Sequence, residues 1–152
     1  MSGQIEYRVD RASATEIADH LLRCDAEFVP PLSERVEIIG YAHKIAAKAT
    51  RFEAWSNGVL VGLVAAYCND SGRRAAYITS TSVLHRWQGA GIASRLLELC
   101  IALAKEQGFA RIELEVNSGN GGAVRLYANK GFTIDRMNDS AAIMCLDIAK
   151  DA

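Results

Sequence analysis

VLHRWQGAGIAS, residues 83–94, joins a β-rich run to an apolar-periodic helix through a glycine turn. The first amide N–H groups of a helix have no intrahelical acceptor and the macrodipole is positive there, so such a turn can bind phosphate oxygens without a lysine. Gly89 and Gly91 let the backbone approach a ligand closely and allow positive φ. The alternative is that both glycines only make a tight strand-to-helix turn.

The composition indicates one domain whose net charge does not attract nucleic acid or anionic membranes. The chain has 152 residues, of which half are apolar, and this is enough for a sizeable core. Its formal net charge of −1 creates no field that would attract nucleic acid or an anionic membrane, so a bound phosphate must be held locally. No secretory signal pattern and no apolar run near the ~20 residues that span a bilayer are found, which predicts a cytoplasmic protein.

The four cysteines predict neither a metal site nor disulfides. Cys24, Cys68, Cys100 and Cys145 lie far apart, form no CxxC pair and stand in apolar stretches. This pattern is typical of small core residues rather than of metal ligands or disulfide partners.

A short strand and two helices are predicted over the first fifty residues. The strand covers residues 4–9, and Ser13 or Thr15 can cap the first helix, which ends before Pro30-Pro31. The second helix is expected over residues 33–48. The apolar faces are expected to consist of Ile17, Leu21 and Leu22 in the first helix, and of Val36, Ile39, Gly40, His43 and Ala47 in the second.

The remaining residues predict strands that alternate with helices. Asn57-Gly58 favours positive φ at both central turn positions and therefore joins two antiparallel strands. The helix that follows the glycine turn stops at Gly108, and Gly131 closes a shorter helix around residues 123–127. Strands are expected over residues 51–55, 59–67, 75–84, 111–116 and 141–148. This order predicts an α/β (α+β) fold, a mixed sheet flanked by helices.

Two separated motifs carry a resemblance to a known family. Residues 88–93 (QGAGIA) fit the pattern (Gln/Arg)-x-x-Gly-x-(Gly/Ala), and residues 120–132 (NGGAVRLYANKGF) fit Asn-x-x-Ala-x-x-Leu-Tyr-x-x-x-Gly-Phe. Together they resemble the GNAT superfamily of acyl-CoA N-acyltransferases. The resemblance implies a single N-acetyltransferase domain over residues 1–152, with a partly split sheet of about seven strands and about four helices. Residues 51–148 would form the acyl-CoA-binding core, and residues 1–50 would shape the acceptor site.

The resemblance also implies a site for acetyl-CoA between the fourth and fifth strands, with no metal. A bulge near the end of the fourth strand would expose backbone groups of Val83 and Leu84 to the pantetheine arm and the thioester. Asn120 would contact the cofactor and Tyr127 would lie beside its sulfur. The pyrophosphate would be bound by backbone N–H groups of Gln88, Gly89, Ala90, Gly91, Ile92 and Ala93, together with Ser94.

Acyl transfer to an amine needs a neutral nucleophile, stabilisation of an oxyanion, and a proton for the thiolate. A backbone N–H of Val83 or Leu84 could polarise the carbonyl, and Tyr127 could protonate the sulfur; the alternative for Tyr127 is packing beside Phe132. Residues 77–82 contain no carboxylate, so three routes of deprotonation stay open: ordered water, a side chain elsewhere, or an acceptor amine whose own pKa is low enough. The side-chain candidates, each also readable as a solvated surface residue, are Glu34, Glu37, His43, Glu113 and Glu115.

We therefore expect an acetyltransferase that acts on a small-molecule amine, such as an amino sugar or another small polar metabolite, by direct transfer in a ternary complex. Hydroxyl acceptors, longer acyl donors and a homodimer stay open. A P-loop is excluded because Gly-Lys-Ser/Thr is missing after Gly91. The rival from another class is a CoA-binding sensor or interaction module without turnover. Candidates for lining the acceptor pocket are Phe28, Tyr41, His43, Trp55 and Tyr67.

Overall fold

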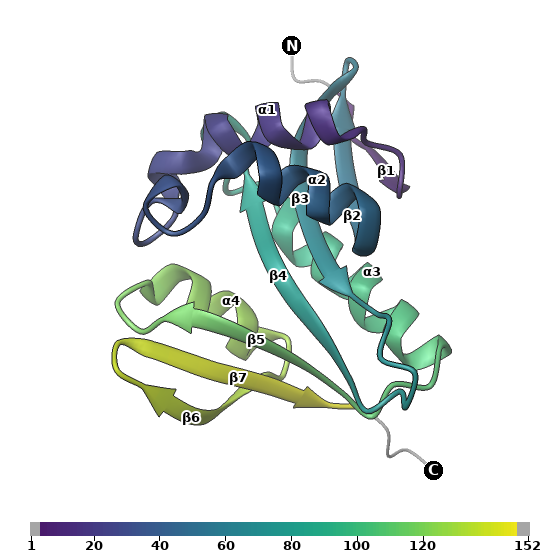
Figure 1. Cartoon of the computed structure of the whole chain (residues 1–152), viewed down its shortest axis with the longest axis vertical. Helices are drawn as coiled ribbons and strands as arrows, with labels where there is room; N and C mark the ends of the chain where they lie inside the picture. The colour runs from purple at the N-terminus through teal and green to yellow at the C-terminus, as the bar shows by residue number, and fades with distance from the viewer. Residues whose placement is uncertain (1–3, 149–152) are drawn as a thin grey trace.

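A seven-stranded mixed sheet organises residues 4–148, the part of the chain that the computed structural model describes (Figure 1). The spatial order is β1-β2-β3-β4-β5-β7-β6, and every neighbouring pair is antiparallel except β4 and β5. The strands are β1 (Glu6–Val9), β2 (Thr50–Ser56), β3 (Val59–Tyr67), β4 (Ala75–Val83), β5 (Arg111–Asn117), β6 (Thr133–Asn138) and β7 (Ala141–Asp147).

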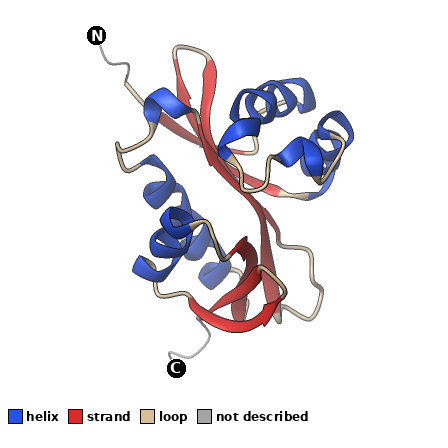
Figure 2. Cartoon of the chain, turned by 90° about the vertical axis from the view of Figure 1, so that its left-hand side faces the viewer, coloured by secondary structure: helices blue, strands red, loops and turns tan. Residues whose placement is uncertain are grey.

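Helices cover both faces of this sheet (Figure 2). They are α1 (Ala14–Cys24), α2 (Ile38–Lys48), α3 (Ile92–Glu106) and α4 (Gly121–Asn129). The apolar residues of α1 and α2 form one core cluster with one face of β3, and those of α3 and α4 form a second cluster with the opposite face. Three short 3₁₀ turns, η1 (Asp25–Glu27), η2 (Leu32–Glu34) and η3 (His85–Trp87), connect these elements. The predicted mixed sheet with about seven strands and four helices is confirmed.

The sheet forks between β4 and β5. Their parallel pairing covers only Ala75–Ile78 against Arg111–Leu114, and beyond this point the two strands diverge (Figure 1). In the pairing with β3, Ala65 lies opposite Ser80 and Ala66 opposite Ile78, so Thr79 is the extra residue of a β-bulge. The bulge therefore starts the fork in the middle of β4, and not near Val83 and Leu84 as expected.

Three details of the helix predictions are wrong. Leu22 is 53% exposed, and the buried face of α1 contains His20 instead. The second helix begins at Ile38 and not near residue 33, because η2 forms a separate turn and the Glu37 side chain accepts the N–H groups of Ile39 and Gly40. Its buried face consists of Ile38, Ala42 and Ile45 rather than of Ile39, His43 and Ala47. Ser13, by contrast, caps α1 in a capping box with Glu16.

Gly62 lets α3 pack directly on β3. A Cβ at this position would lie 2.7 Å from Cγ2 of Ile92 and 3.3 Å from Cδ1 of Leu96. We expect Gly62→Ala to lower the free energy of unfolding by about 1–3 kcal/mol, because the first turn of α3 must move. Urea denaturation measures this effect. Gly72→Ala is the matched control, since its Cβ would meet only ordinary contacts at 3.6 Å or more. Equal stability of the two variants would contradict the close packing.

Candidate functional site

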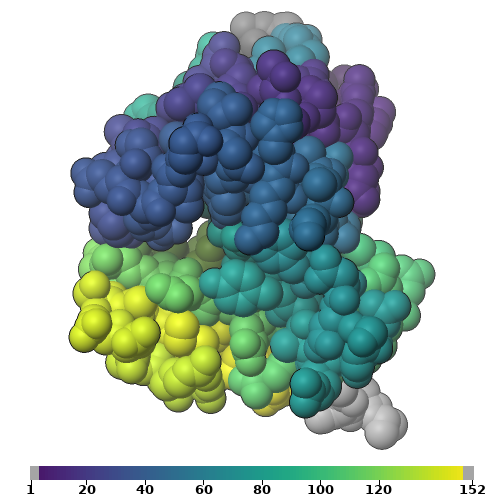
Figure 3. All heavy atoms as spheres, in the orientation of Figure 1, coloured from purple at the N-terminus to yellow at the C-terminus, as the bar shows by residue number. Residues whose placement is uncertain are grey.

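Two adjoining cavities lie at the fork of the sheet. The turn cavity, about 530 Å³, lies between the end of β4, the glycine turn and α4. The fork cavity, about 400 Å³, lies between the segment from Phe28 to Tyr41 and strands β4 and β5. Figure 3 shows a hollow between the blue N-terminal atoms and the green and yellow C-terminal atoms. The residues that line both cavities are Phe28, Thr81, Asn120, Ala123 and Tyr127.

The glycine turn leaves open backbone donors at the wall of the turn cavity. Gly89 and Gly91 have φ of 83° and 81°, and a Cβ at either position would meet nothing within 4 Å, so glycine is needed for its conformation and not for space. Gly91 is the N-cap of α3 without a side-chain cap, and the first intrahelical bond runs from Arg95 N–H to the Gly91 carbonyl (3.0 Å). The N–H groups of residues 92–94 therefore have no intrahelical acceptor.

Most of the predicted donor-binding residues meet at the turn cavity. Leu84 and Ala90 do not line it, and the Leu84 N–H donates to the Val61 carbonyl (2.9 Å). Alternate residues of an antiparallel strand direct their backbone groups to opposite sides, so the Val83 N–H faces away from β3. The predicted residues that do line the cavity are Val83, Gln88, Gly89, Gly91, Ile92, Ala93, Ser94, Asn120 and Tyr127.

Tyr127 lies at the junction of the two cavities. It projects from α4 and is 7% exposed, and its ring packs beside Phe132 with centroids 5.9 Å apart. Burial raises the pKa of its hydroxyl, and the nearby Thr81 hydroxyl partly offsets this shift. The phenol is therefore protonated at neutral pH, as a proton donor must be.

Asn120 positions the start of α4. Its Oδ1 accepts the Ala123 N–H (3.2 Å), which makes it the N-cap, and it lines both cavities. Gly121 and Gly122, which follow it, are the first two residues of α4. Helix capping thus fixes Asn120 at the junction.

Two of the five candidates for the acceptor pocket line the fork cavity. Phe28 and Tyr41 do so, and the Tyr41 hydroxyl donates to the Thr79 carbonyl (2.8 Å), which ties α2 to the bulge. His43, Trp55 and Tyr67 line neither cavity. Trp55 is buried in the core between β2 and α1, where its indole N–H donates to Glu53.

The candidate bases are separated by the structure. Glu115 lines the fork cavity, whereas Glu113 lines neither cavity and pairs with Arg111 (3.3 Å). Glu37 caps α2, and neither Glu34 nor His43 lines either cavity. Glu115 is therefore the one carboxylate of these candidates that lines the fork cavity.

Sequence reasoning missed a buried pair, His20 and Ser82, behind the turn cavity. His20 Nδ1 lies 2.9 Å from the Leu60 carbonyl, and Nε2 lies 2.9 Å from Oγ of Ser82, which lines the cavity. A carbonyl only accepts, so Nδ1 carries the hydrogen and the neutral ring accepts the Ser82 hydroxyl at Nε2. Burial lowers the pKa of His20 to about 4, chiefly by desolvation.

This pKa predicts a loss of stability in acid. Between pH 6.5 and about 4, His20 is protonated in the unfolded chain but stays neutral in the folded protein. The free energy of unfolding therefore falls as the pH falls through this range, by about 3 kcal/mol in all. Denaturant unfolding at pH 7, 6, 5 and 4 measures it. His20→Gln should remove this slope, whereas the exposed His43→Gln should keep it. Identical slopes for His20→Gln and the parent would contradict the assignment.

Burial keeps two of the four thiols, those of Cys24 and Cys100, protonated. All four cysteines are free, and burial raises the pKa of Cys24 and Cys100 to about 12. Among residues 4–148 no group of three or more His, Cys, Asp or Glu could hold a metal ion. None of the helices in the described part of the chain is both long and apolar enough to cross a membrane.

Comparison with protein families and curated sequences identifies relatives. The family model described as "Acetyltransferase (GNAT) family" matches residues 14–132. N-acetyltransferase 8F1 from Rattus norvegicus is 35% identical over 82 residues, which are 52% of this chain and 37% of that protein. The match therefore spans little more than a third of the relative's length.

Solved structures share the whole fold. The ribosomal-protein-S18-alanine N-acetyltransferase from Escherichia coli has a TM-score of 0.77 at 20% identity, with 98% of this chain and 97% of that chain covered. The structure of yncA from Salmonella typhimurium with its cofactor acetyl-CoA has a TM-score of 0.74 at 18% identity, with 98% and 96% covered. At these identities the likeness shows the fold alone.

Proposed function

Because this chain belongs to the acetyltransferase (GNAT) family, we propose that it moves the acetyl group of acetyl-CoA directly to the amine of a small molecule, in a ternary complex. One observation carries this proposal: a cavity beside open helix N–H groups meets a second cavity at a protonated phenol, Tyr127. A donor and an acceptor could thus approach each other from separate sides.

The turn cavity suits the donor. The open N–H groups of residues 92–94 and the positive end of α3 favour the pyrophosphate of acetyl-CoA. Beyond Ile78 the edge of β4 no longer pairs with β5, so backbone groups that face away from β3 can bind the pantetheine amides, except the Thr79 and Val83 carbonyls, which accept the Tyr41 hydroxyl and the Gln88 side-chain amide. The Val83 N–H would polarise the thioester carbonyl, since the Leu84 N–H already donates to the Val61 carbonyl. We infer that residues 51–148 bind acyl-CoA and that residues 1–50 shape the acceptor site.

The fork cavity suits the acceptor. A neutral amine nitrogen entering there would attack the thioester carbon and form the N–C bond, while the Val83 N–H stabilises the oxyanion. The C–S bond then breaks with its electron pair on sulfur, and Tyr127 gives this sulfur its proton. Glu115, directly or through water, would take the proton that the amine loses, and the phenol would regain its own from solvent.

Calorimetry and thiol release together test the proposal. We expect acetyl-CoA to bind, and CoA to be released only when an amine is present, at a rate that saturates with both substrates and with no acetyl-enzyme detectable by mass spectrometry. The rival, a CoA-binding sensor or interaction module, would bind acetyl-CoA without acceptor-dependent release. Absence of binding at millimolar acetyl-CoA would contradict both.

A further inference from the structure

The fork cavity contains two charges of opposite sign. Of the described residues that line it, the charged ones are Arg35 and Glu115. Neither forms an ion pair within residues 4–148, whereas Glu113, two residues before Glu115 on β5, pairs with Arg111. Both charges are therefore available to a ligand.

The two charges come from different walls of the cavity. Arg35 follows η2 in the N-terminal segment, whereas Glu115 lies on β5, one residue beyond Leu114, the last residue that pairs with β4. Both charges act on the hydroxyl of Tyr77. Burial raises the pKa of this hydroxyl, the negative charge of Glu115 raises it further, and the positive charge of Arg35 lowers it. The two charges thus flank one small space without neutralising each other.

We propose that the acceptor is an amine that also carries an anionic group, which Arg35 binds while Glu115 receives the amino end. This inference rests on the proposed function and names the substrate class of the same site. A ligand with an amine and an anion would give both charged side chains of the cavity a partner, because the amine N–H donates to Glu115 and the anion pairs with Arg35, whereas a simple amine would leave Arg35 unpaired.

The anionic group of the acceptor would be either a carboxylate or a phosphate. The planar guanidinium of an arginine can bind either a carboxylate or a phosphate in a bidentate manner. A charge-assisted hydrogen bond contributes about 1.5–3 kcal/mol, so an anionic acceptor should exceed its neutral analogue about 10-fold to 150-fold in kcat/KM. The experiment must therefore separate carboxylate from phosphate.

Matched acceptor pairs test this preference. Glucosamine is compared with glucosamine 6-phosphate, and tyramine with tyrosine, by CoA release from acetyl-CoA and by calorimetric titration into the protein saturated with CoA. We expect the anionic member of at least one pair to be favoured at least about tenfold. The pair that shows the preference identifies phosphate or carboxylate as the anion.

Arg35→Gln should reduce this preference to within about threefold while turnover of the neutral member stays within about twofold of the parent. Arg23→Gln is the matched control, because Arg23 is an exposed arginine of α1 that pairs with Asp19 and lines neither cavity. It should keep the full preference.

Two results would overturn the inference. One is that neither pair discriminates, in turnover or in binding; the other is that Arg35→Gln lowers both members of a pair alike. Failure of the proposed function would give a different result from failure of this inference. In that case no amine releases CoA, while calorimetry with the same pairs still reports whether an anion is bound through Arg35.

Discussion

Tyr127→Phe is expected to lower kcat for acetyl transfer about 10²-fold to 10⁴-fold, the contribution typical of a positioned general acid. The substitution removes only the hydroxyl at the junction of the two cavities, and the ring that packs beside Phe132 remains. The affinity for acetyl-CoA should therefore stay within about twofold of the parent. Steady-state kinetics with the best acceptor and calorimetry with acetyl-CoA measure the two quantities.

The control separates chemistry from packing. Tyr7→Phe makes the same change on β1, where the tyrosine ring lies under Arg95 and lines neither cavity. Both variants should unfold at the parent's temperature, and Tyr7→Phe should keep the parent's kcat. If Tyr127→Phe turned over at the parent's rate, the phenol would be a packing residue, and a water molecule would have to protonate the sulfur.

The glycine turn was predictable because its signal is local. Positive φ at Gly89 and Gly91 follows from residue type, and the apolar spacing after Gly91 fixes where α3 begins. The same holds for Asn57 and Gly58, which have φ of 51° and 77° in the turn between β2 and β3. The donor half of the candidate site is built from such local features.

The elements that were missed depend on long-range contacts. Every residue of β6 is exposed, so no apolar alternation marks this edge strand, and it forms because β7 supplies a partner. Likewise α2 is shifted because Glu37 caps it, and His20 is buried because the Leu60 carbonyl and Ser82 satisfy its ring 40 and 62 residues away in sequence. A single sequence does not reveal which distant group will satisfy a polar side chain.

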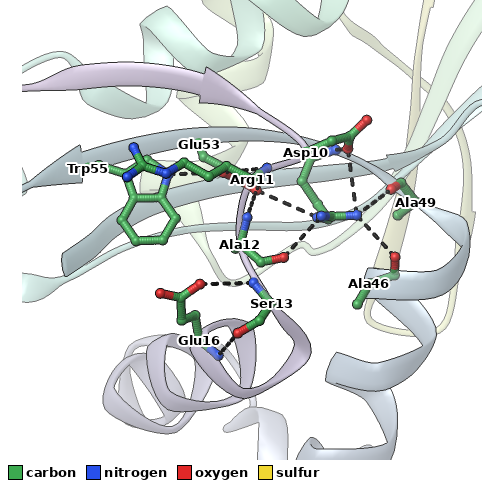
Figure 4. A network of polar contacts seen from close by, with 10 residues as sticks. Asp10, Arg11, Ala12, Ser13, Glu16, Ala46, Ala49, Glu53 and Trp55 are labelled. Carbon is green, nitrogen blue, oxygen red and sulfur yellow. Dashed lines mark hydrogen bonds and ion pairs between the residues drawn. The ribbon is translucent and has the colours of Figure 1, made fainter. Parts of the chain in front are cut away.

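Glu53 is another such residue. Its place in an alternating strand suggests a solvated side chain, yet six of the seven residues of β2 are buried and Glu53 is 0% exposed. The carboxylate accepts the backbone N–H groups of Arg11 and Ala12 and the Trp55 indole N–H, at 2.9–3.1 Å, and pairs with Arg51 at 3.5 Å (Figure 4). It thus holds the chain between β1 and α1 onto β2.

Removing this carboxylate should be costly. Glu53→Ala is expected to lower the free energy of unfolding by about 3–5 kcal/mol, because it removes the buried one of the two carboxylates that pair with Arg51, leaving only the half-exposed Asp10, and leaves two backbone N–H groups without acceptors. Urea denaturation at pH 7 measures the change. Glu106→Ala, at an exposed position near the end of α3, should stay within about 0.5 kcal/mol of the parent.

Removing the Glu53 carboxylate should also weaken acetyl-CoA binding at the turn cavity. Glu53 fixes the segment that leads into Ser13, the N-cap of α1, and α1 presents His20 to Ser82 at the wall of the turn cavity. Folded Glu53→Ala protein, studied in stabilising sucrose, should therefore bind acetyl-CoA more weakly than Glu106→Ala protein under the same conditions. Equal stability of the two variants would mean that the N-terminal segment holds its place by apolar packing alone, and that the buried carboxylate contributes nothing to it.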